Sequence, residues 1–221
     1  MTTRTRIVAA APLLAAALLV ACPAQGADNP EVRWKISTWG KPRAFTTGIE
    51  TLAKYVEKHT DGKFKMTIGY GTLGAAKDLL DILNAGAVQM TTICSAYNPD
   101  KTPAYSGLDL PFLPLPDFDT QWKVHEAYHQ DPTIKKEFAR WNAIPYSSNL
   151  LPQYEFIGKN NAPRTLDDFK GMRVRAIGGI GEAMRNLGAI PTSMPATEVY
   201  TALDRGTVDA VSFPSTYALA S

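Results

Sequence analysis

The 221-residue chain is poor in the residues from which disulfide scaffolds, metal centres and polyanion-binding surfaces are built. It has only two cysteines and three histidines, and 23 basic against 21 acidic residues leave a net charge of +2. Because charges of both signs are interspersed, no basic stripe is available for nucleic acid. Removal of the N-terminal segment described next would leave Cys94 alone or with Cys22, so no intrachain disulfide is expected.

Long apolar runs are absent beyond the N-terminus. There, two arginines precede an apolar run from Ile7 to Ala21 that is too short to span a bilayer, and small residues follow it. This pattern predicts a signal peptide over residues 1–26 and export to the periplasm. Two cleavage sites stay open: 19–22 has the form of a lipoprotein box, which would place a lipid anchor on Cys22, and 24–26 suits release of a soluble protein.

The first half of the remaining chain alternates strand and helix patterns. Apolar residues recur at every second position in the strands and at helical spacing between them. The pattern predicts strands over 31–37, 64–70 and 88–94, with helices around 49–56 and 79–83. Strands separated by helix-length segments favour a largely parallel α/β sheet.

The second half repeats this alternation after a proline-rich passage, 108–118, that we expect to be an ordered loop. Helices are predicted over 119–129 and 134–141, an extended crossing over 144–157, strands over 172–177 and 207–213, and helices around 180–187 and 199–203. We expect a first domain over 27–150 and a second over 151–212. Because nothing after residue 214 would finish the sheet, we also expect that a C-terminal part is missing.

One segment resembles a zinc site. His125–His129, HEAYH, matches the pattern in which two histidines one helical turn apart bind zinc and the glutamate acts as general base. Charged and polar neighbours such as Lys123 and Gln130 indicate a solvated helix face, and Glu137 is not placed as a third ligand. We therefore predict no metal site here, and keep an exported zinc-dependent hydrolase as an alternative.

Glycines at 178, 179 and 181 follow a predicted strand and open a predicted helix, as a dinucleotide fingerprint does. Met184 stands where that fingerprint needs glycine or alanine, so no nucleotide cofactor is expected. The segment instead predicts a turn that brings backbone amides and a helix N-terminus close to a cleft.

Candidate ligand-binding residues lie where predicted strands end. Trp39 follows the first strand, and Cys94 and Ser95 close another. Ligands of open parallel α/β sheets bind beyond the carboxyl ends of the strands. Since no Cys–His–Asn grouping accompanies Cys94, we interpret it as a small apolar wall and expect no catalytic residues.

The runs LDDFKGMRVRAIGG (166–179) and LGAIPTSMPATEVYTALDRGTVDAVSFP (187–214) resemble the solute-binding protein of tripartite ATP-independent periplasmic (TRAP) transporters, of the dicarboxylate-binding DctP type. GTLGAAKDLLDILNAGAVQM (71–90) and LDLPFL (108–113) agree in order and spacing, so the resemblance covers about 32–214. It implies a clamshell of two α/β domains with largely parallel sheets, in which residues 213–221 return toward the first domain and hinge. It also implies a non-enzymatic receptor that binds an organic acid and delivers it to the membrane subunits of an ion-gradient-driven importer.

The resemblance implies that Arg175 pairs with the ligand carboxylate and that Arg173 is a solvent-side neighbour. A planar guanidinium suits this role because it offers two parallel donors to two carboxylate oxygens. Two departures from the family pattern narrow the ligand. Phe213 replaces an asparagine of members that bind polar acids, and Glu155, beside Tyr154, replaces a second arginine of some members. We therefore expect a monocarboxylate with an apolar, aromatic, keto or hydroxy portion, with Glu155 available to an amine or hydroxyl.

A third reading, the binding protein of an ATP-driven importer, has a similar clamshell and stays open at this stage.

Overall fold

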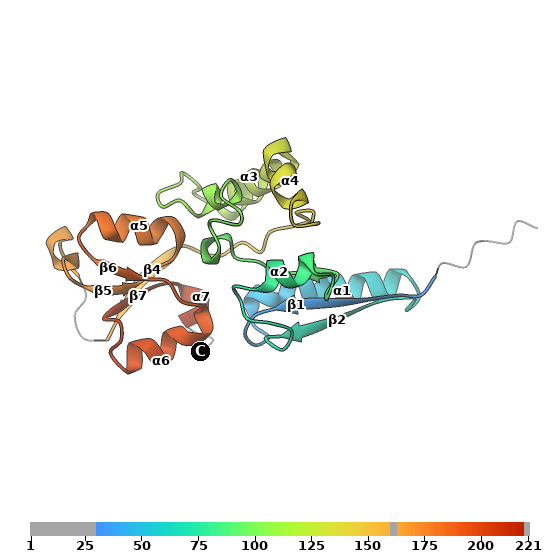
Figure 1. Ribbon diagram of the computed structural model, residues 1–221, viewed down its shortest axis with the longest axis horizontal. Coiled ribbons are helices and arrows are strands. Elements are labelled where there is room, and N and C mark those ends of the chain that lie inside the picture. Colours follow the sequence, from blue (N-terminus) through green and yellow to red (C-terminus); the bar gives the residue numbers. More distant parts are fainter. Residues whose placement is uncertain (1–29, 160–162, 219–221) are drawn as a thin grey trace, which may run out of the picture. The chain divides into compact units, whose positions relative to one another are not determined.

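The computed structural model describes residues 30–159 and 163–218, which carry two β-sheets and their helices (Figure 1). The first sheet has the strand order β2-β1-β3 and is parallel throughout. It consists of β1 (Val32–Thr38), β2 (Phe64–Tyr70) and β3 (Met90–Thr91). The last three residues of β1 are buried, as expected for a central strand whose end lies inside the protein.

Two helices belong to this first sheet, α1 (Thr47–His59) and α2 (Leu79–Asn84). Gly62 lies just past the end of α1: it has φ +75°, and its N–H donates to the Glu57 carbonyl at 2.8 Å. A positive φ is open to glycine at little cost, which is why the helix ends here.

A helical segment follows, with α3 (Phe118–Gln130) and α4 (Pro132–Ala139). Asp117 accepts a hydrogen bond from the Thr120 N–H at 2.7 Å, and Asp131 accepts one from Thr133 at 2.7 Å. These are ordinary N-caps, and Pro132 occupies the first position of α4, where no backbone donor is needed.

The second sheet has the strand order β4-β7-β5-β6. Its strands are β4 (Tyr154–Gly158), β5 (Arg173–Arg175), β6 (Ile190–Thr192) and β7 (Ala210–Pro214), accompanied by α5 (Gly178–Asn186), α6 (Val199–Asp204) and α7 (Ser215–Ala218). β4 is antiparallel to β7, and the other pairs are parallel. The predicted α/β class with largely parallel sheets is confirmed.

Two strand predictions were wrong in extent, and one strand, β6, was not predicted. β3 is two residues long where seven were predicted, because the chain turns into a 3₁₀ helix at Ser95–Tyr97. β5 ends at Arg175 because Ile177 already caps α5. β6 carries Pro191. It is an edge strand, where a residue without an N–H is tolerated.

The predicted domain limits at 150 and 212 stay a prediction. The predicted signal peptide and Cys22 lie outside the described residues. No helix in the described ranges is long and apolar enough to cross a membrane.

Candidate functional site

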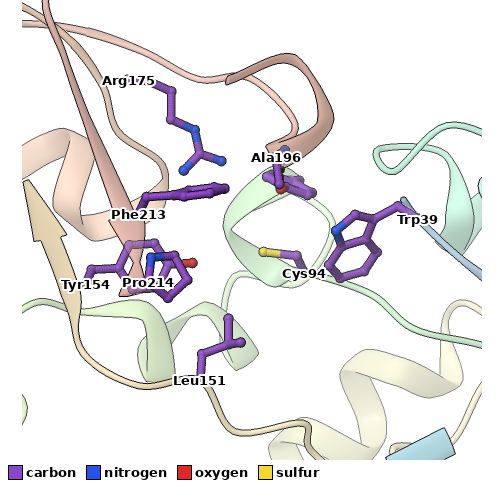
Figure 2. A pocket seen from close by; sticks show the side chains of 9 residues that line it. Trp39, Cys94, Leu151, Tyr154, Arg175, Ala196, Phe213 and Pro214 are labelled. Atoms are coloured by element: carbon purple, nitrogen blue, oxygen red, sulfur yellow. Dashed lines mark hydrogen bonds between the residues drawn. The ribbon is translucent and has the colours of Figure 1, made fainter. Parts of the chain in front are cut away.

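A small cavity lies where several strands end. Trp39 follows β1, Arg175 is the last residue of β5, and Phe213 and Pro214 end β7. The cavity volume is about 20 Å³. Its walls are Trp39, Cys94, Tyr97, Leu151, Tyr154, Arg175, Ala196, Phe213 and Pro214 (Figure 2). The carboxyl edge of the strands is where ligands of this fold class bind.

Five of the seven candidate residues meet in this cavity: Trp39, Cys94, Tyr154, Arg175 and Phe213. They come from distant parts of the chain. Strand ends pointed to Trp39 and Cys94, and the family resemblance pointed to Tyr154, Arg175 and Phe213. Ser95 and Glu155 do not line it.

Arg175 is the charged residue of the cavity wall, and only 1% of it is exposed. Its Nε and Nη2 donate to the Met194 carbonyl at 3.1 and 2.8 Å, and Nη1 donates to the Ser212 carbonyl at 2.9 Å. A guanidinium has five N–H donors, so one on each terminal nitrogen stays without a protein acceptor in the described ranges. No carboxylate among the described residues lies within 4.0 Å of it.

Arg173 lies two residues earlier, at the first position of β5, and therefore on the same face of the strand as Arg175. Its side chain is 47% exposed and forms an ion pair with Asp209, with Nη2 to Oδ1 at 2.5 Å. The two arginines differ because they lie at opposite ends of this short strand: Arg173, at the amino end, is turned to solvent as expected, and Arg175, at the carboxyl end, is buried.

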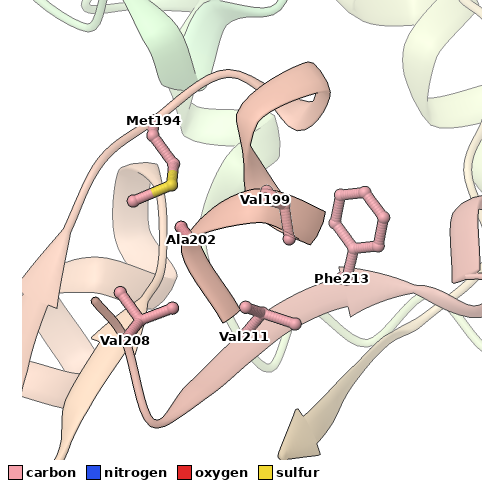
Figure 3. Packing of buried hydrophobic residues seen from close by; sticks show 6 residues of the cluster. All are labelled: Met194, Val199, Ala202, Val208, Val211 and Phe213. Atoms are coloured by element: carbon pink, nitrogen blue, oxygen red, sulfur yellow. The ribbon is translucent and has the colours of Figure 1, made fainter. Parts of the chain in front are cut away.

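Phe213 is both cavity wall and core. Its ring lies 5.4 Å from the Arg175 guanidinium carbon, a cation–π contact. It also belongs to a buried apolar cluster, in which Figure 3 shows it beside Val199 and Val211. The complete cluster is Met194, Val199, Ala202, Val208, Val211 and Phe213. The wall that faces the guanidinium is thus held in place by the packing of the second sheet.

Trp39 is clamped on several sides and is 5% exposed. Its ring contacts Phe45 at 4.9 Å and Tyr97 at 5.9 Å between centroids, and the Arg43 guanidinium lies 5.9 Å from the ring centre. Arg43 Nη1 also donates to the Trp39 carbonyl at 2.9 Å. The indole Nε1 is buried and has no hydrogen-bond partner among the described residues.

Cys94 is a wall residue rather than a nucleophile. Burial, with a contribution from the Asp109 charge, raises the pKa of its thiol to about 12. A thiol with this pKa is protonated at neutral pH and unreactive.

Ser95, which is not among the cavity walls, is 7% exposed and donates to Asp109 Oδ2 at 2.5 Å. Burial raises the pKa of Asp109 to about 6, against the lowering effect of that hydrogen bond. Sequence reasoning missed Asp109, because an aspartate before a leucine–proline pair reads as an ordinary loop residue.

Glu155 is exposed on β4, opposite Phe213 in the strand pairing. Its side chain is not part of the cavity wall, so its contact with ligand stays a prediction that this arrangement does not favour. The wall residues that sequence reasoning missed are Tyr97, Leu151, Ala196 and Pro214. Tyr97 could have been found, since it is an aromatic residue just beyond a predicted strand.

The glycine turn serves packing. Gly178 has φ +52°, and a Cβ there would lie 2.9 Å from the Ala96 Cβ. A Cβ on Gly179 would lie 3.0 Å from the Asp109 carbonyl oxygen. The space at the start of α5 is filled by protein, so the expected approach of this turn to a ligand is replaced by close contact with residues 96–111.

The solvated-face interpretation of HEAYH was wrong for His129, which is 3% exposed. The Ser148 hydroxyl lies 2.8 Å from His125 Nδ1 and 3.1 Å from His129 Nε2, and Tyr105 Oη lies 3.1 Å from His129 Nε2. Ser148 therefore occupies the point toward which both imidazoles turn. Burial lowers the pKa of both histidines, so this cluster is neutral.

Glu137 is committed elsewhere, since it accepts backbone hydrogen bonds from Ala104 at 2.8 Å and Tyr105 at 2.9 Å. Across residues 30–159 and 163–218, no three His, Cys, Asp or Glu side chains form a group that could hold a metal ion.

Comparison with known proteins identifies the family. The model of "bacterial extracellular solute-binding protein, family 7" (DctP) matches residues 37–221. The monocarboxylate 2-oxoacid-binding periplasmic protein of Nostoc sp. is 31% identical over 196 residues, 86% of this chain and 53% of that protein. The C4-dicarboxylate-binding periplasmic protein DctP of Rhodobacter capsulatus is 29% identical over 173 residues, 76% of this chain and 50% of that protein.

Solved structures of solute-binding proteins are also similar to this chain. A TRAP periplasmic solute-binding protein from Colwellia psychrerythraea with bound calcium and pyruvate is 25% identical, with a TM-score of 0.69, over 83% of this chain and 57% of that one. The Bordetella pertussis receptor DctP6, which binds pyroglutamic acid, is 20% identical and shows a common fold, with a TM-score of 0.74 over 86% of this chain and 62% of that one.

The chain spans about half the length of the curated relatives it matches. Neither alternative from the sequence, a zinc hydrolase or a receptor of an ATP-driven importer, is supported by these comparisons. With its α/β sheets, its arginine at a strand end and the match over 37–221, the chain belongs to the DctP family of bacterial extracellular solute-binding proteins.

Proposed function

We propose that this protein is the periplasmic receptor of a TRAP transporter, that it binds a small organic monocarboxylate at Arg175, and that it delivers this acid to the membrane subunits. The protein acts by binding alone, without catalysis or a cofactor. Its relatives carry names of solute-binding proteins, which supports this reading.

The observation that carries the proposal is a buried arginine without an acidic partner. A buried charge is costly unless it is paired. Arg175 has only carbonyl acceptors in the described ranges, and two of its donors stay available on its terminal nitrogens. A ligand carboxylate would supply the missing charge and accept both hydrogen bonds in the bidentate arrangement that arginine favours.

The rest of the wall supports one carboxylate rather than two. Beside Arg175 the lining residues are aromatic, apolar or, for Cys94, a neutral thiol, and no second cation is among them. A second carboxylate would therefore lose its hydration without gaining a charged partner. The Nostoc relative, named for 2-oxo monocarboxylates, points in the same direction.

A cavity of about 20 Å³ has room for roughly one water molecule. An organic acid can enter only if the walls separate and then close on it. Hinge closure around a ligand is the motion by which periplasmic receptors work, and it would also exclude water from the arginine–carboxylate pair.

Calorimetric titration of the purified protein tests the proposal. Pyruvate, 2-oxobutyrate and benzoate are compared with malate as the dicarboxylate and with pyruvamide, which lacks the charge. We expect saturable binding of at least one monocarboxylate, weaker binding of malate and none of pyruvamide. Equal binding of pyruvate and pyruvamide, or no binding of any acid, would contradict the proposal. Delivery is tested separately, by uptake into vesicles that contain TRAP membrane subunits and carry a sodium gradient.

A further inference from the structure

We infer that the indole N–H of Trp39 is the donor that selects the ligand, and that it takes an uncharged oxygen acceptor, a keto or hydroxyl oxygen, carried by the same small molecule whose carboxylate pairs with Arg175. This inference rests on the proposed function and deepens it. It names a specificity-determining residue and a substrate class, oxo or hydroxy monocarboxylates, as distinct from plain carboxylates.

The first support is an unsatisfied donor. Buried N–H groups in proteins are almost always hydrogen-bonded, and an exception calls for an explanation. Trp39 is 5% exposed, it lines the cavity, and its Nε1 has no partner in the part of the chain that the structure describes. An indole nitrogen donates and never accepts, so the group that completes it is an acceptor.

The second support is the position of this donor. In Figure 2 the nitrogen of the Trp39 ring is on the side turned toward Ala196 and Cys94, two other residues of the wall. Arg175 lies on the same cavity with its two remaining N–H groups. One ligand can therefore meet a charged double donor through its carboxylate and a neutral single donor through another oxygen.

The third support is that the ring is held in place. Phe45 and Tyr97 contact it, and Arg43 binds the Trp39 carbonyl at 2.9 Å and the Lys41 carbonyl at 2.7 Å. A donor that is fixed before binding loses little freedom when the ligand arrives, which is the condition for strong discrimination. A site built to hydrogen-bond an oxygen rejects analogues that lack it, because its own donor is then left buried and unpaired.

The neutral character of Trp39 decides the kind of oxygen. An uncharged donor in an apolar wall does not compensate a second carboxylate, whereas it does satisfy a keto or hydroxyl oxygen. Cys94, Leu151 and Ala196 add a neutral and apolar wall to the cavity, which suits a short apolar chain on the ligand. Pyruvate, 2-oxobutyrate and lactate fit this description, and propionate and butyrate are their matched analogues without the oxygen.

The test compares oxo and plain acids in the unsubstituted protein, in Trp39→Phe and in Trp34→Phe. Trp39→Phe removes the N–H and keeps an aromatic ring. Trp34→Phe is the matched control, since Trp34 packs on Phe64 in the first sheet and does not line the cavity. We expect 2-oxobutyrate to bind at least tenfold more tightly than butyrate in the unsubstituted protein and in Trp34→Phe. In Trp39→Phe we expect 2-oxobutyrate and butyrate to bind about equally, with the affinity for butyrate unchanged.

An unchanged ratio in Trp39→Phe would overturn the inference while leaving the Arg175 proposal standing, because both acids would still bind. Binding of neither acid to the unsubstituted protein would instead overturn the proposed function, and this inference with it. If Trp39→Phe does not fold, the indole ¹⁵N–¹H resonances of the unsubstituted protein decide. One of them should shift downfield on addition of pyruvate and not of propionate, and an equal response to both acids would count against Trp39.

Discussion

Replacement of Asp109 by asparagine should stabilise the protein at neutral pH and leave it unchanged in acid. Burial raises the pKa of this carboxyl from its ordinary value of 3.8 to about 6, so the folded protein binds the proton more tightly than the unfolded chain. Stability from this group is fully present below pH 3.8 and is lost as the pH rises through about 6. At about 1.4 kcal/mol per pH unit, the ionised Asp109 costs at most about 3 kcal/mol above pH 7.

Part of that cost will not be recovered, because the side chain is only partly buried and solvent screens its charge. We therefore expect Asp109→Asn to gain about 1–2 kcal/mol at pH 7.5. The amide oxygen of asparagine still accepts the hydrogen bond from Ser95, which makes the substitution close to isosteric. At pH 4, where the native Asp109 is protonated, we expect no gain.

Urea unfolding followed by circular dichroism at pH 4, 6 and 7.5 measures this difference between variant and parent, so that other titrating groups cancel. Asp100→Asn, at an exposed turn, is the matched control and should show no pH-dependent gain. If Asp109→Asn were no more stabilised at pH 7.5 than at pH 4, the interpretation of Asp109 as a buried, destabilised carboxylate would be refuted.

Two further predictions concern packing. His129→Ala should destabilise the protein by about 2–4 kcal/mol, because it removes a buried ring and leaves the Tyr105 and Ser148 hydroxyls without this partner. The control Glu126→Ala, on the exposed face of α3, should change the stability measured by urea unfolding little. If His129→Ala left the free energy of unfolding unchanged, the hydrogen-bonded cluster around His129 would contribute nothing to stability. Gly178→Ala should lower the midpoint of thermal unfolding more than Gly86→Ala. Both glycines have positive φ, but only a Cβ on residue 178 would lie 2.9 Å from the Ala96 Cβ. Equal losses in the two variants would show that this contact relaxes freely.

Much of the fold follows from periodicity. β1, β2, α1 and α3 begin and end within three residues of their predicted limits, because each has a clear apolar pattern and, for α1, a local stop at Gly62. β6 escaped prediction because it is short, carries Pro191 and gains its place only by pairing with β5. Short edge strands owe their existence to a neighbour, which no local pattern records.

The site was predictable where it depends on strand ends and on the family resemblance. Trp39 follows one predicted strand and Arg175 lies near the end of another, and the α/β topology brings such ends together. The burial of His129 was not predictable, because the polar residues around it suggested solvent while its partners Tyr105 and Ser148 are far away in the chain. Asp109 was missed for the same reason, since its environment is made by Ser95 and by residues distant in sequence.

The central claim, that Arg175 holds a ligand carboxylate, is tested most directly by the affinity of pyruvate for Arg175→Ala, with Arg173→Ala as the matched control from the same strand. Removing one partner of a desolvated, hydrogen-bonded charge pair costs about 2–5 kcal/mol. We therefore expect Arg175→Ala to lose roughly 30-fold to several thousand-fold in calorimetric affinity. Arg173→Ala, whose side chain is exposed and paired with Asp209, should lose less than about tenfold. Arg175→Lys should also bind poorly, because an ammonium is a point charge without the two parallel donors. Equal losses in the two alanine variants, or near-native affinity in the lysine variant, would contradict the account.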